Sequence, residues 1–244
     1  MKIGIQLWSV REELKIDFKG VLHELARIGF EGVEFARVYG EMEPGELGIF
    51  LKESGLECAG LYENAASIAE DGNPVYGYAS ALSCKYFSTG LAGKANPQEW
   101  PEAIELVKTA AGISDKNGIQ FLYHNHHQEF AKIGNEYALD ILFNKTDRRI
   151  VMAELDVGWI KKGGECPVKY IRKYAGRIPF LHLRDVSAEG QSVEVGKGTV
   201  DMKNVINEAE KAGVEWLIYE HDSILGASLK SAENSFNVIK KITG

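Results

Sequence analysis

The sequence has few cysteines and no long apolar run. The cysteines Cys58, Cys84 and Cys166 are scattered through 244 residues, and none is part of a Cys-x-x-Cys pair. This pattern disfavours a disulfide framework or a structural zinc site, so we expect reduced cysteines that serve for packing. No apolar run approaches the roughly 20 residues that cross a bilayer. Because the chain opens directly with strand-like sequence, we expect a cytoplasmic protein without a targeting segment or a membrane partner.

An excess of positive charge is also missing. The chain has 28 Lys and Arg against 35 Asp and Glu, for a formal net charge of -7. A negative net charge does not attract the phosphate backbone of a nucleic acid, so we expect no nucleic-acid partner. The hydrophobic share of 45% and the charged share of 26% are typical of a globular protein.

Short apolar segments alternate with amphipathic segments along the chain. The apolar segments predict strands at 3–8, 32–35, 56–62, 85–88, 150–156, 178–183 and 216–219, and a further strand that begins at residue 119. Apolar residues at helical spacing, bounded by Gly or Pro, predict helices at 17–28, 44–54, 74–83, 96–117, 136–144, 167–175, 201–212 and 228–242. The same strand–helix unit therefore occurs eight times.

This alternation predicts an α/β fold in which crossover helices join parallel strands. Eight units and a length near the roughly 250 residues of one barrel favour a closed (β/α)8 TIM barrel over an open sheet. No linker divides the chain, so we expect a single domain over residues 1–244. The doubly wound alternative needs a Gly-x-Gly-x-x-Gly motif after the first strand, and the sequence has none there.

One strand breaks abruptly into polar residues that suit a metal ion. The segment runs from Ile119 through Phe121 and Leu122 to His124, Asn125, His126, His127 and Glu129. Because side chains alternate along a strand, His124 and His126 share one face. Imidazoles bind metal ions and act as general bases, so the pair is a candidate site. The alternative is that both are hydrogen-bonded surface histidines at the strand end.

Ionisable residues also follow the other predicted strands. In a (β/α)8 barrel, catalytic groups lie at the carboxyl ends of the strands, which meet around one rim. The ionisable residues found there are Glu34, Glu63, His124, His126, Glu129, Glu154, Asp156, His182, Asp185, Glu220, His221 and Asp222. Polar residues are normal where strands reach solvent, but their repetition on consecutive strands favours one shared site.

Four of these residues make a mixed nitrogen and oxygen ligand set: His124, Asp156, His182 and Glu220. Two imidazoles favour Mn, Zn, Co or Fe over Mg or Ca. For His182 the alternative is a hydrogen-bonded histidine inside the barrel. We expect the substrate to contact other groups at this rim, namely His126, Glu129, Asp185, Lys197, Trp159 and Glu63. For Asp185 and Lys197 a role in the loop or in a surface turn competes with this interpretation, as core packing does for Trp159.

Several motifs together resemble the xylose isomerase-like TIM barrel superfamily, grouped as sugar phosphate isomerases/epimerases. They are Tyr123-His-Asn-His126, Leu155-Asp-Val-Gly-Trp159, Leu181-His-Leu-Arg-Asp185, Val195-Gly-Lys-Gly198 and Ile218-Tyr-Glu220. The resemblance implies one divalent ion bound by Glu, Asp, His and Glu from strands five to eight, with the glutamates exchanging the substrate proton. This chain departs from that pattern at His124, in place of a glutamate, and at Trp159, in place of a histidine.

The superfamily also includes DNA-repair enzymes that resemble endonuclease IV and use three zinc ions. This chain has Ser192-Val-Glu194 where that subgroup places further histidines. Too few ligands remain for a trinuclear cluster, so we expect no DNA-repair activity.

The main functional hypothesis is a divalent-metal-dependent isomerase or epimerase of a sugar, sugar phosphate or keto-sugar. The resemblance implies proton transfer through a metal-stabilised enediolate, with Glu220 as one acid/base group and His124 or Glu154 as its partner. The alternatives are a lyase or dehydratase of a keto-sugar or keto-glycoside at the same site, and a sugar-binding barrel without catalysis. We expect a small carbohydrate as the partner, and the sequence leaves open whether the chain forms a homo-oligomer.

Overall fold

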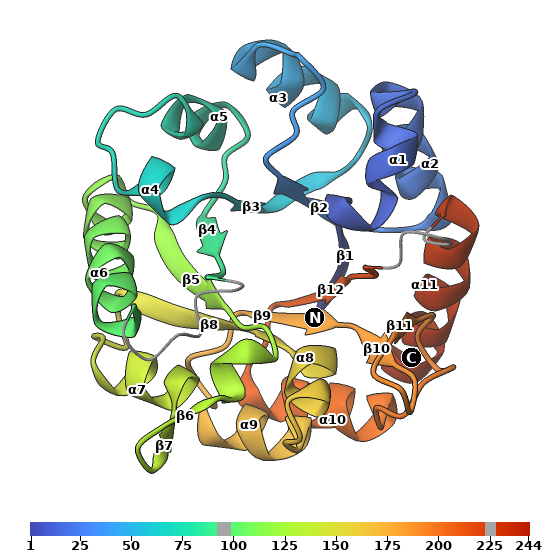
Figure 1. Ribbon diagram of the computed structural model, residues 1–244. Helices are drawn as coiled ribbons and strands as arrows, with labels where there is room; N and C mark the ends of the chain where they lie inside the picture. Colours follow the sequence, from blue (N-terminus) through green and yellow to red (C-terminus); the bar gives the residue numbers. More distant parts are fainter. Residues whose placement is uncertain (92–98, 223–227) are drawn as a thin grey trace.

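Eight parallel strands close into a barrel in the computed structural model, which describes residues 1–91, 99–222 and 228–244 (Figure 1). Around the barrel the strands follow in sequence order, and the last pairs with the first. They are β1 (Lys2–Gln6), β2 (Gly32–Ala36), β3 (Glu57–Tyr62), β4 (Tyr86–Thr89), β5 (Gln120–His124), β8 (Val151–Asp156), β9 (Phe180–Leu183) and β12 (Trp216–Tyr219). The predicted (β/α)8 barrel is confirmed.

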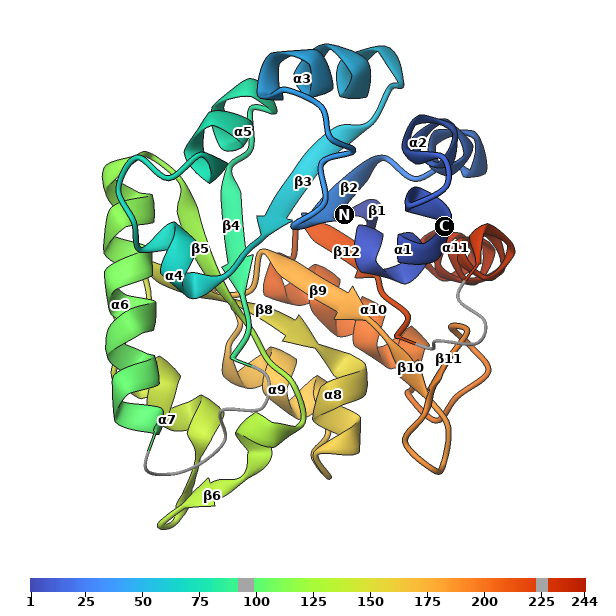
Figure 2. The ribbon, with the colours of Figure 1, turned by 45° about the horizontal axis from the view of Figure 1, so that its top comes forward.

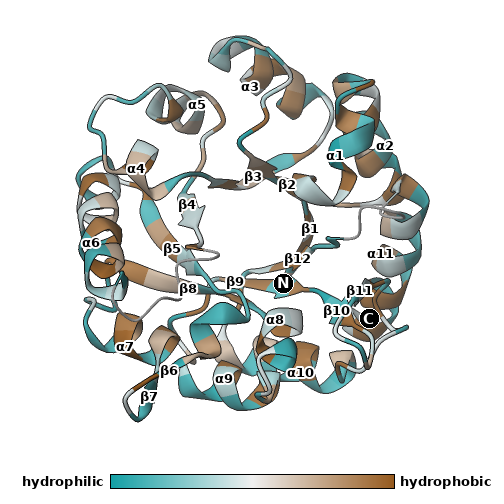
Figure 3. Cartoon of the chain, viewed as in Figure 1, coloured by the Kyte–Doolittle hydropathy of each residue, from teal (hydrophilic) through white to brown (hydrophobic). Residues whose placement is uncertain are grey.

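Helices surround the barrel (Figures 1 and 2). The main helices are α2 (Phe18–Ile28), α3 (Pro44–Glu53), α5 (Val75–Ala81), α6 (Trp100–Lys116), α7 (Ala138–Asn144), α9 (Pro167–Lys173), α10 (Met202–Ala212) and α11 (Leu229–Thr243). Hydrophobic and hydrophilic residues alternate around them (Figure 3), as expected for helices with one face on a core. Within the described residues, no helix is both long enough and apolar enough to span a membrane.

The structure also contains short elements that the sequence did not predict. They are the 3-10 turns η1 (Leu7–Val10) and η2 (Gln128–Phe130), the helices α1 (Arg11–Leu14), α4 (Ala65–Ile68) and α8 (Val157–Lys162), and the hairpin strands β6 (Lys132–Ile133), β7 (Glu136–Tyr137), β10 (Asp185–Val186) and β11 (Ser192–Val193). One or two turns are too short to show a helical period.

The expected element boundaries need some corrections. Residues 7–8 belong to a 3-10 turn rather than to the first strand, and residues 136–137 form a hairpin strand rather than the start of a helix. The expected helix start at 96–98 lies outside the described residues. All three cysteines are free, but Cys166 is exposed, so the expectation of packing cysteines does not hold for it.

The barrel interior has an apolar floor and a polar upper layer. The floor at the amino-terminal end consists of Ala59, Leu122, Phe180, Trp216 and Ile218. Residues two apart on a strand share a face, so Phe180 lies in the floor while His182 reaches the layer above it. The upper layer therefore has room for the polar residues at the strand ends.

Asp185 holds the loop that follows β9, which continues into the β10–β11 hairpin (Figure 2). Its buried carboxylate accepts hydrogen bonds from the backbone N–H groups of Val186, Gly196, Gly198 and Val200. Lys197, in the same loop, forms an exposed ion pair with Glu194 at 2.6 Å. Asp185 and Lys197 were both predicted to contact the substrate, but their side chains are bonded to groups of this loop.

We predict that Asp185→Ala destabilises the protein strongly because four backbone N–H groups lose a charged acceptor. The expected loss is about 3 kcal/mol, or roughly 6–12 °C in Tm. Lys197→Ala is the control and should change stability by less than about 0.5 kcal/mol, since exposed ion pairs contribute little. Thermal and denaturant unfolding of both variants measures this difference. Equal stability of the two variants would contradict the structural role of Asp185.

Candidate active site

The carboxyl ends of the strands surround a cavity of about 360 Å³. This volume lies at the low end for small-molecule pockets. The lining residues are Gln6, Trp8, Ala36, Arg37, Tyr62, His124, His126, His127, Gln128, Trp159, His182, Arg184, Glu220 and Asp222. The cavity therefore lies at the end of the barrel where catalytic groups are expected.

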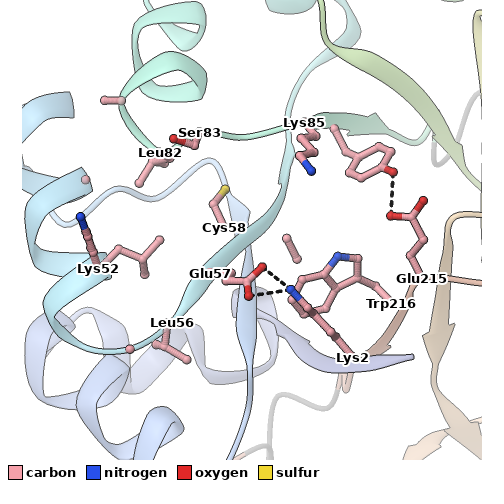
Figure 4. Close-up of a pocket in the computed structure, with 16 residues that line it drawn as sticks. Lys2, Lys52, Leu56, Glu57, Cys58, Leu82, Ser83, Lys85, Glu215 and Trp216 are labelled. Atoms are coloured by element: carbon pink, nitrogen blue, oxygen red, sulfur yellow. Dashed lines mark hydrogen bonds and ion pairs between the residues drawn. The ribbon is translucent and has the colours of Figure 1, made fainter.

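A larger hollow of about 670 Å³ lies at the opposite end, where Lys2, Glu57 and Trp216 line it (Figure 4). The Lys2 ammonium group lies 2.6 Å from the Glu57 carboxylate, and both side chains are about half exposed. This hollow is separated from the strand-end cavity by the apolar floor of the barrel. We place the candidate active site in the smaller cavity.

The predicted ligand set of His124, Asp156, His182 and Glu220 lies together at the base of this cavity. One potential ligand atom from each residue lies within 4.8 Å of the others. His124, Asp156 and His182 come from the ends of β5, β8 and β9, and Glu220 follows β12. All four are buried, with exposed fractions of 8% or less. This set of donors could hold a divalent transition-metal ion.

Both ring nitrogens of His182 face carboxylates. Nδ1 lies 2.8 Å from Glu220 Oε2, and Nε2 lies 2.8 Å from Glu34 Oε2. Ser88 on β4 donates its hydroxyl to Glu34 Oε1 at 2.6 Å. A carboxylate behind a histidine fixes its tautomer and orientation. Glu34 therefore fixes the ring so that Nδ1 is available as a ligand.

His124 is supported in a similar way by Glu154. Its Nδ1 lies 3.0 Å from Glu154 Oε1, which leaves Nε2 for a ligand. Glu154 also approaches His182 Nε2 at 3.2 Å, is fully buried and does not line the cavity. The sequence suggested Glu154 as a proton-transfer partner, but it lies two residues before Asp156 and thus one layer deeper in the barrel. The structure places it behind the imidazoles.

Arg184 is clamped against two of the four ligands. Its Nε donates to Asp156 Oδ2 at 2.8 Å, and Nη2 pairs with Glu220 Oε2 at 2.7 Å. The guanidinium lies 4.4 Å from the Trp159 ring. A Cβ at Gly158 would lie only 2.7 Å from Arg184 Cγ. Residues 156, 158 and 159 thus provide an acceptor, free space and an aromatic surface for this arginine.

Burial and neighbouring charges shift the pKa values of His124, His182 and Glu220 in different directions. Burial and the nearby His182 lower the pKa of His124 well below its ordinary value, so this ring is neutral. Burial alone would lower the pKa of His182, but Glu154 and Glu34 outweigh it and raise that pKa well above its ordinary value. Burial likewise opposes ionisation of Glu220, but Arg184 and His182 outweigh it and lower its pKa.

The charges at the base of the cavity fit a divalent cation. Glu34, Glu154, Asp156 and Glu220 provide up to four negative charges, whereas Arg184 and His182 provide at most two positive ones. Glu154 Oε2 is buried and has no hydrogen-bond partner among the described residues. Burial and the charge of Glu34 raise the pKa of Glu154 well above its ordinary value. Because uncompensated buried charge is costly, a divalent ion among the four ligands would favour the ionised forms of these carboxyl groups.

The other predicted site residues are distributed unevenly. His126 and Trp159 line the cavity. Glu129 is buried and accepts hydrogen bonds from the Tyr123 hydroxyl and the His126 backbone N–H. Glu63 is buried and accepts one from the Tyr39 hydroxyl. Like Asp185 and Lys197, Glu129 and Glu63 do not line the cavity. Their carboxylates instead bond to other residues of the chain.

Several residues that line the cavity or support its ligands could not be assigned to the site from the sequence. The sequence identifies Glu34 only as one of the ionisable residues at the strand ends, and it contains Arg184 only as part of the motif that runs from Leu181 to Asp185. Arg37, His127 and Gln128 lie in loops, where no periodic pattern shows which way a side chain points. A positive φ of 60° at Arg37 is one structural sign of a specialised position.

Comparison with known sequences agrees with the architecture. Residues 22–242 match the sequence model described as xylose isomerase-like TIM barrel. An inosose dehydratase from Geobacillus kaustophilus is 26% identical over 191 residues, which cover 68% of this chain and 61% of that protein. The chain thus aligns with less than two thirds of the length of this relative.

Comparison with solved structures extends over nearly the whole chain. A sugar phosphate isomerase/epimerase from Parabacteroides distasonis has a TM-score of 0.85 at 19% identity and covers 98% of each chain. A D-allulose 3-epimerase from Methylomonas sp. has a TM-score of 0.73 at 13% identity, covering 99% of this chain and 98% of the other. At such identities the likeness concerns the fold alone.

We predict that Glu34→Gln weakens Mn²⁺ binding about 10- to 100-fold, because the support behind His182 loses its charge. Glu53→Gln, on the exposed surface of α3, is the matched control and should bind like the parent. Calorimetric titration gives both affinities, and circular dichroism checks the fold. Parent-like Mn²⁺ affinity in a folded Glu34→Gln variant would show that this carboxylate does not support the site.

We also predict that Mn²⁺ binds more tightly as the pH rises from 6 to 8. The pKa of His182 is raised, so its proton competes with the ion at low pH and is released on binding. Release of one proton tightens the apparent Kd about tenfold per pH unit. Titrations in buffers of different ionisation enthalpy count the protons released. A constant Kd with no proton release would contradict this assignment of His182.

Proposed function

The chain belongs to the xylose isomerase-like TIM barrel family, and we propose that it catalyses divalent-metal-dependent dehydration of a keto-sugar or cyclic polyhydroxy ketone. The observation that carries the proposal is the unequal placement of proton-transferring groups around the cavity. Among the described lining residues, the carboxylates are Glu220 and Asp222, which both follow β12. The wall after β5 instead has the imidazole of His126.

An ion held by His124, Asp156, His182 and Glu220 would polarise the ketone and make the adjacent C–H group more acidic. His126 is the group we assign to remove that proton. Its ring centre lies 4.8 Å from that of His124. Burial lowers the pKa of His126 to about 4, so the ring is neutral near pH 7 and can accept a proton.

The same imidazole can complete an elimination. Once protonated, His126 is a strong acid because of its low pKa, and it can donate the proton to the hydroxyl group on the next carbon. The electron pair of the C–H bond forms the new carbon–carbon double bond, the C–O bond breaks, and the hydroxyl leaves as water. The ring returns to its neutral state, so one residue is sufficient for both proton transfers.

Epimerisation or isomerisation is the second candidate. Inverting one carbon requires proton-transferring groups on opposite sides of the substrate. Glu220 lines the cavity after β12, which is three strands from β5 around the barrel. Glu220 is bonded to Arg184 and His182 and belongs to the ligand set, whereas His126 lies outside that set, which favours elimination through His126. The name of the sequence relative, an inosose dehydratase, supports dehydration.

A test in D₂O separates the two reactions. We expect the Mn²⁺-loaded enzyme to remove water from an inosose, a pentahydroxycyclohexanone, and His126→Gln to slow this reaction about 100-fold or more. Because His126 is outside the ligand set, the Mn²⁺ affinity of the variant should stay within about twofold of the parent. Nuclear magnetic resonance follows the products. Deuterium uptake with every hydroxyl retained would instead establish epimerisation, and an inosose and keto-sugar panel without turnover would contradict both reactions.

A further inference from the structure

Five side chains that line the cavity have a buried polar atom without a hydrogen-bond partner among the described residues. Two of them are Nδ1 of His126, the proposed base, and Nη1 of Arg184, which supports the ligands. The other three lie on one wall. They are Nδ1 of His127, Oε1 of Gln128 and Nε1 of Trp159, none of which forms a hydrogen bond with a described residue. All three residues line the cavity. Unpaired buried polar atoms are unfavourable. Their partners must therefore come from outside the described chain, and a molecule in the cavity is in the right place.

This wall is held in position from several sides. The rings of His127 and Trp159 lie 5.3 Å apart. The Trp159 ring also contacts the Arg184 guanidinium at 4.4 Å and the Lys162 ammonium at 4.9 Å. Its backbone N–H donates to Asp156 Oδ1 at 2.8 Å. The indole N–H is therefore presented by a ring that the surrounding contacts already orient.

The polar groups on the other side of the cavity have partners within the chain. Trp8 Nε1 donates to Asp222 Oδ1 at 2.9 Å. The Tyr62 hydroxyl accepts from the Gly90 backbone N–H at 3.1 Å. Arg37 Nη1 donates to Asn64 Oδ1 at 3.0 Å. The unpaired atoms of the lining residues thus cluster around Trp159, on His126, His127, Gln128, Trp159 and Arg184, whereas Trp8, Tyr62 and Arg37 are hydrogen-bonded within the chain.

We propose that His127, Gln128 and Trp159 form a recognition wall for hydroxyl groups remote from the reacting carbons, and that the substrate is an unphosphorylated polyhydroxy ketone. This inference rests on the proposed dehydration and adds its substrate class. An indole N–H only donates, whereas an amide and an imidazole can donate and accept. Hydroxyl groups match such a mixed set, whereas ionised phosphate oxygens only accept. Lys197, one of the expected substrate contacts and a cation that could have bound a phosphate, is paired with Glu194 on the surface.

Two tryptophan variants test the recognition wall. Trp159→Phe removes an unpaired N–H and keeps an aromatic ring, whereas Trp8→Phe removes an N–H that is already bonded to Asp222. The ligands are an inosose and its monodeoxy analogues, titrated into the Mn²⁺-loaded enzyme. We expect Trp159→Phe to bind the inosose about 3- to 10-fold more weakly and to lose discrimination against one deoxy analogue. Trp8→Phe should discriminate between the same ligands as the parent does.

The outcomes separate this inference from the proposed function. Parent-like affinity and discrimination in Trp159→Phe would overturn the recognition wall. Tighter binding of a phosphorylated keto-sugar than of its unphosphorylated form, or no binding of any inosose or keto-sugar, would overturn the substrate class. Binding with the expected discrimination but without loss of water would overturn the dehydration and support the recognition wall, since discrimination is read from Kd and dehydration from products.

Discussion

The pairing of His182 with carboxylates on both of its nitrogens is the interaction on which the rest of the site depends. Glu34 comes from β2, His182 from β9, and Glu220 follows β12. Two hydrogen bonds of 2.8 Å, one at each ring nitrogen of His182, connect the three residues. A buried imidazole is stable in this place only because these carboxylates compensate its charge. The same contacts orient it toward the ligands on the neighbouring strands.

The layered barrel makes this polar cluster compatible with a stable core. Phe180 and Trp216 close the floor, so water does not need to fill the interior below the site. Above them, Glu34 and Glu154 face imidazoles rather than solvent. The cavity then exposes only the outer edge of this network. Its lining combines strand residues such as Tyr62 and His182 with loop and helix residues such as His127 and Trp159. The strands hold the polar network in place, and the loops complete the wall.

Much of this arrangement could be predicted from the sequence. The strands and helices alternate with clear periods. Because the carboxyl ends of barrel strands meet at one rim, the sequence predicts that His124, Asp156, His182 and Glu220 lie together, as they do in the structure. The sequence does not show which of the other strand-end carboxylates bind the ligands and which support them from behind. Glu154 and Asp156 share a strand face, and only the three-dimensional register shows that Glu154 lies deeper and behind the imidazoles.

Loops set the other limit of sequence analysis. Asp185 follows a strand as a catalytic aspartate would, yet its carboxylate binds backbone N–H groups up to fifteen residues away. His127 and Gln128 carry no periodic signal because they precede or form a 3-10 turn. The direction of such side chains depends on contacts across the cavity, here with Trp159 of α8. Those contacts join residues far apart in sequence, so local patterns do not reveal them.

Gly158 and Arg184 must be considered as one unit in any redesign of this barrel. The arginine passes so close to the backbone at Gly158 that even a methyl group there would displace it. Introducing a side chain at position 158 would therefore release the guanidinium from Asp156 and Glu220 and alter the centre indirectly. A shorter residue at position 184 would not relieve this contact, because the added Cβ would also lie 2.8 Å from the Cβ and from the backbone oxygen of Arg184. Wherever the two backbone segments keep this spacing, position 158 is therefore restricted to glycine.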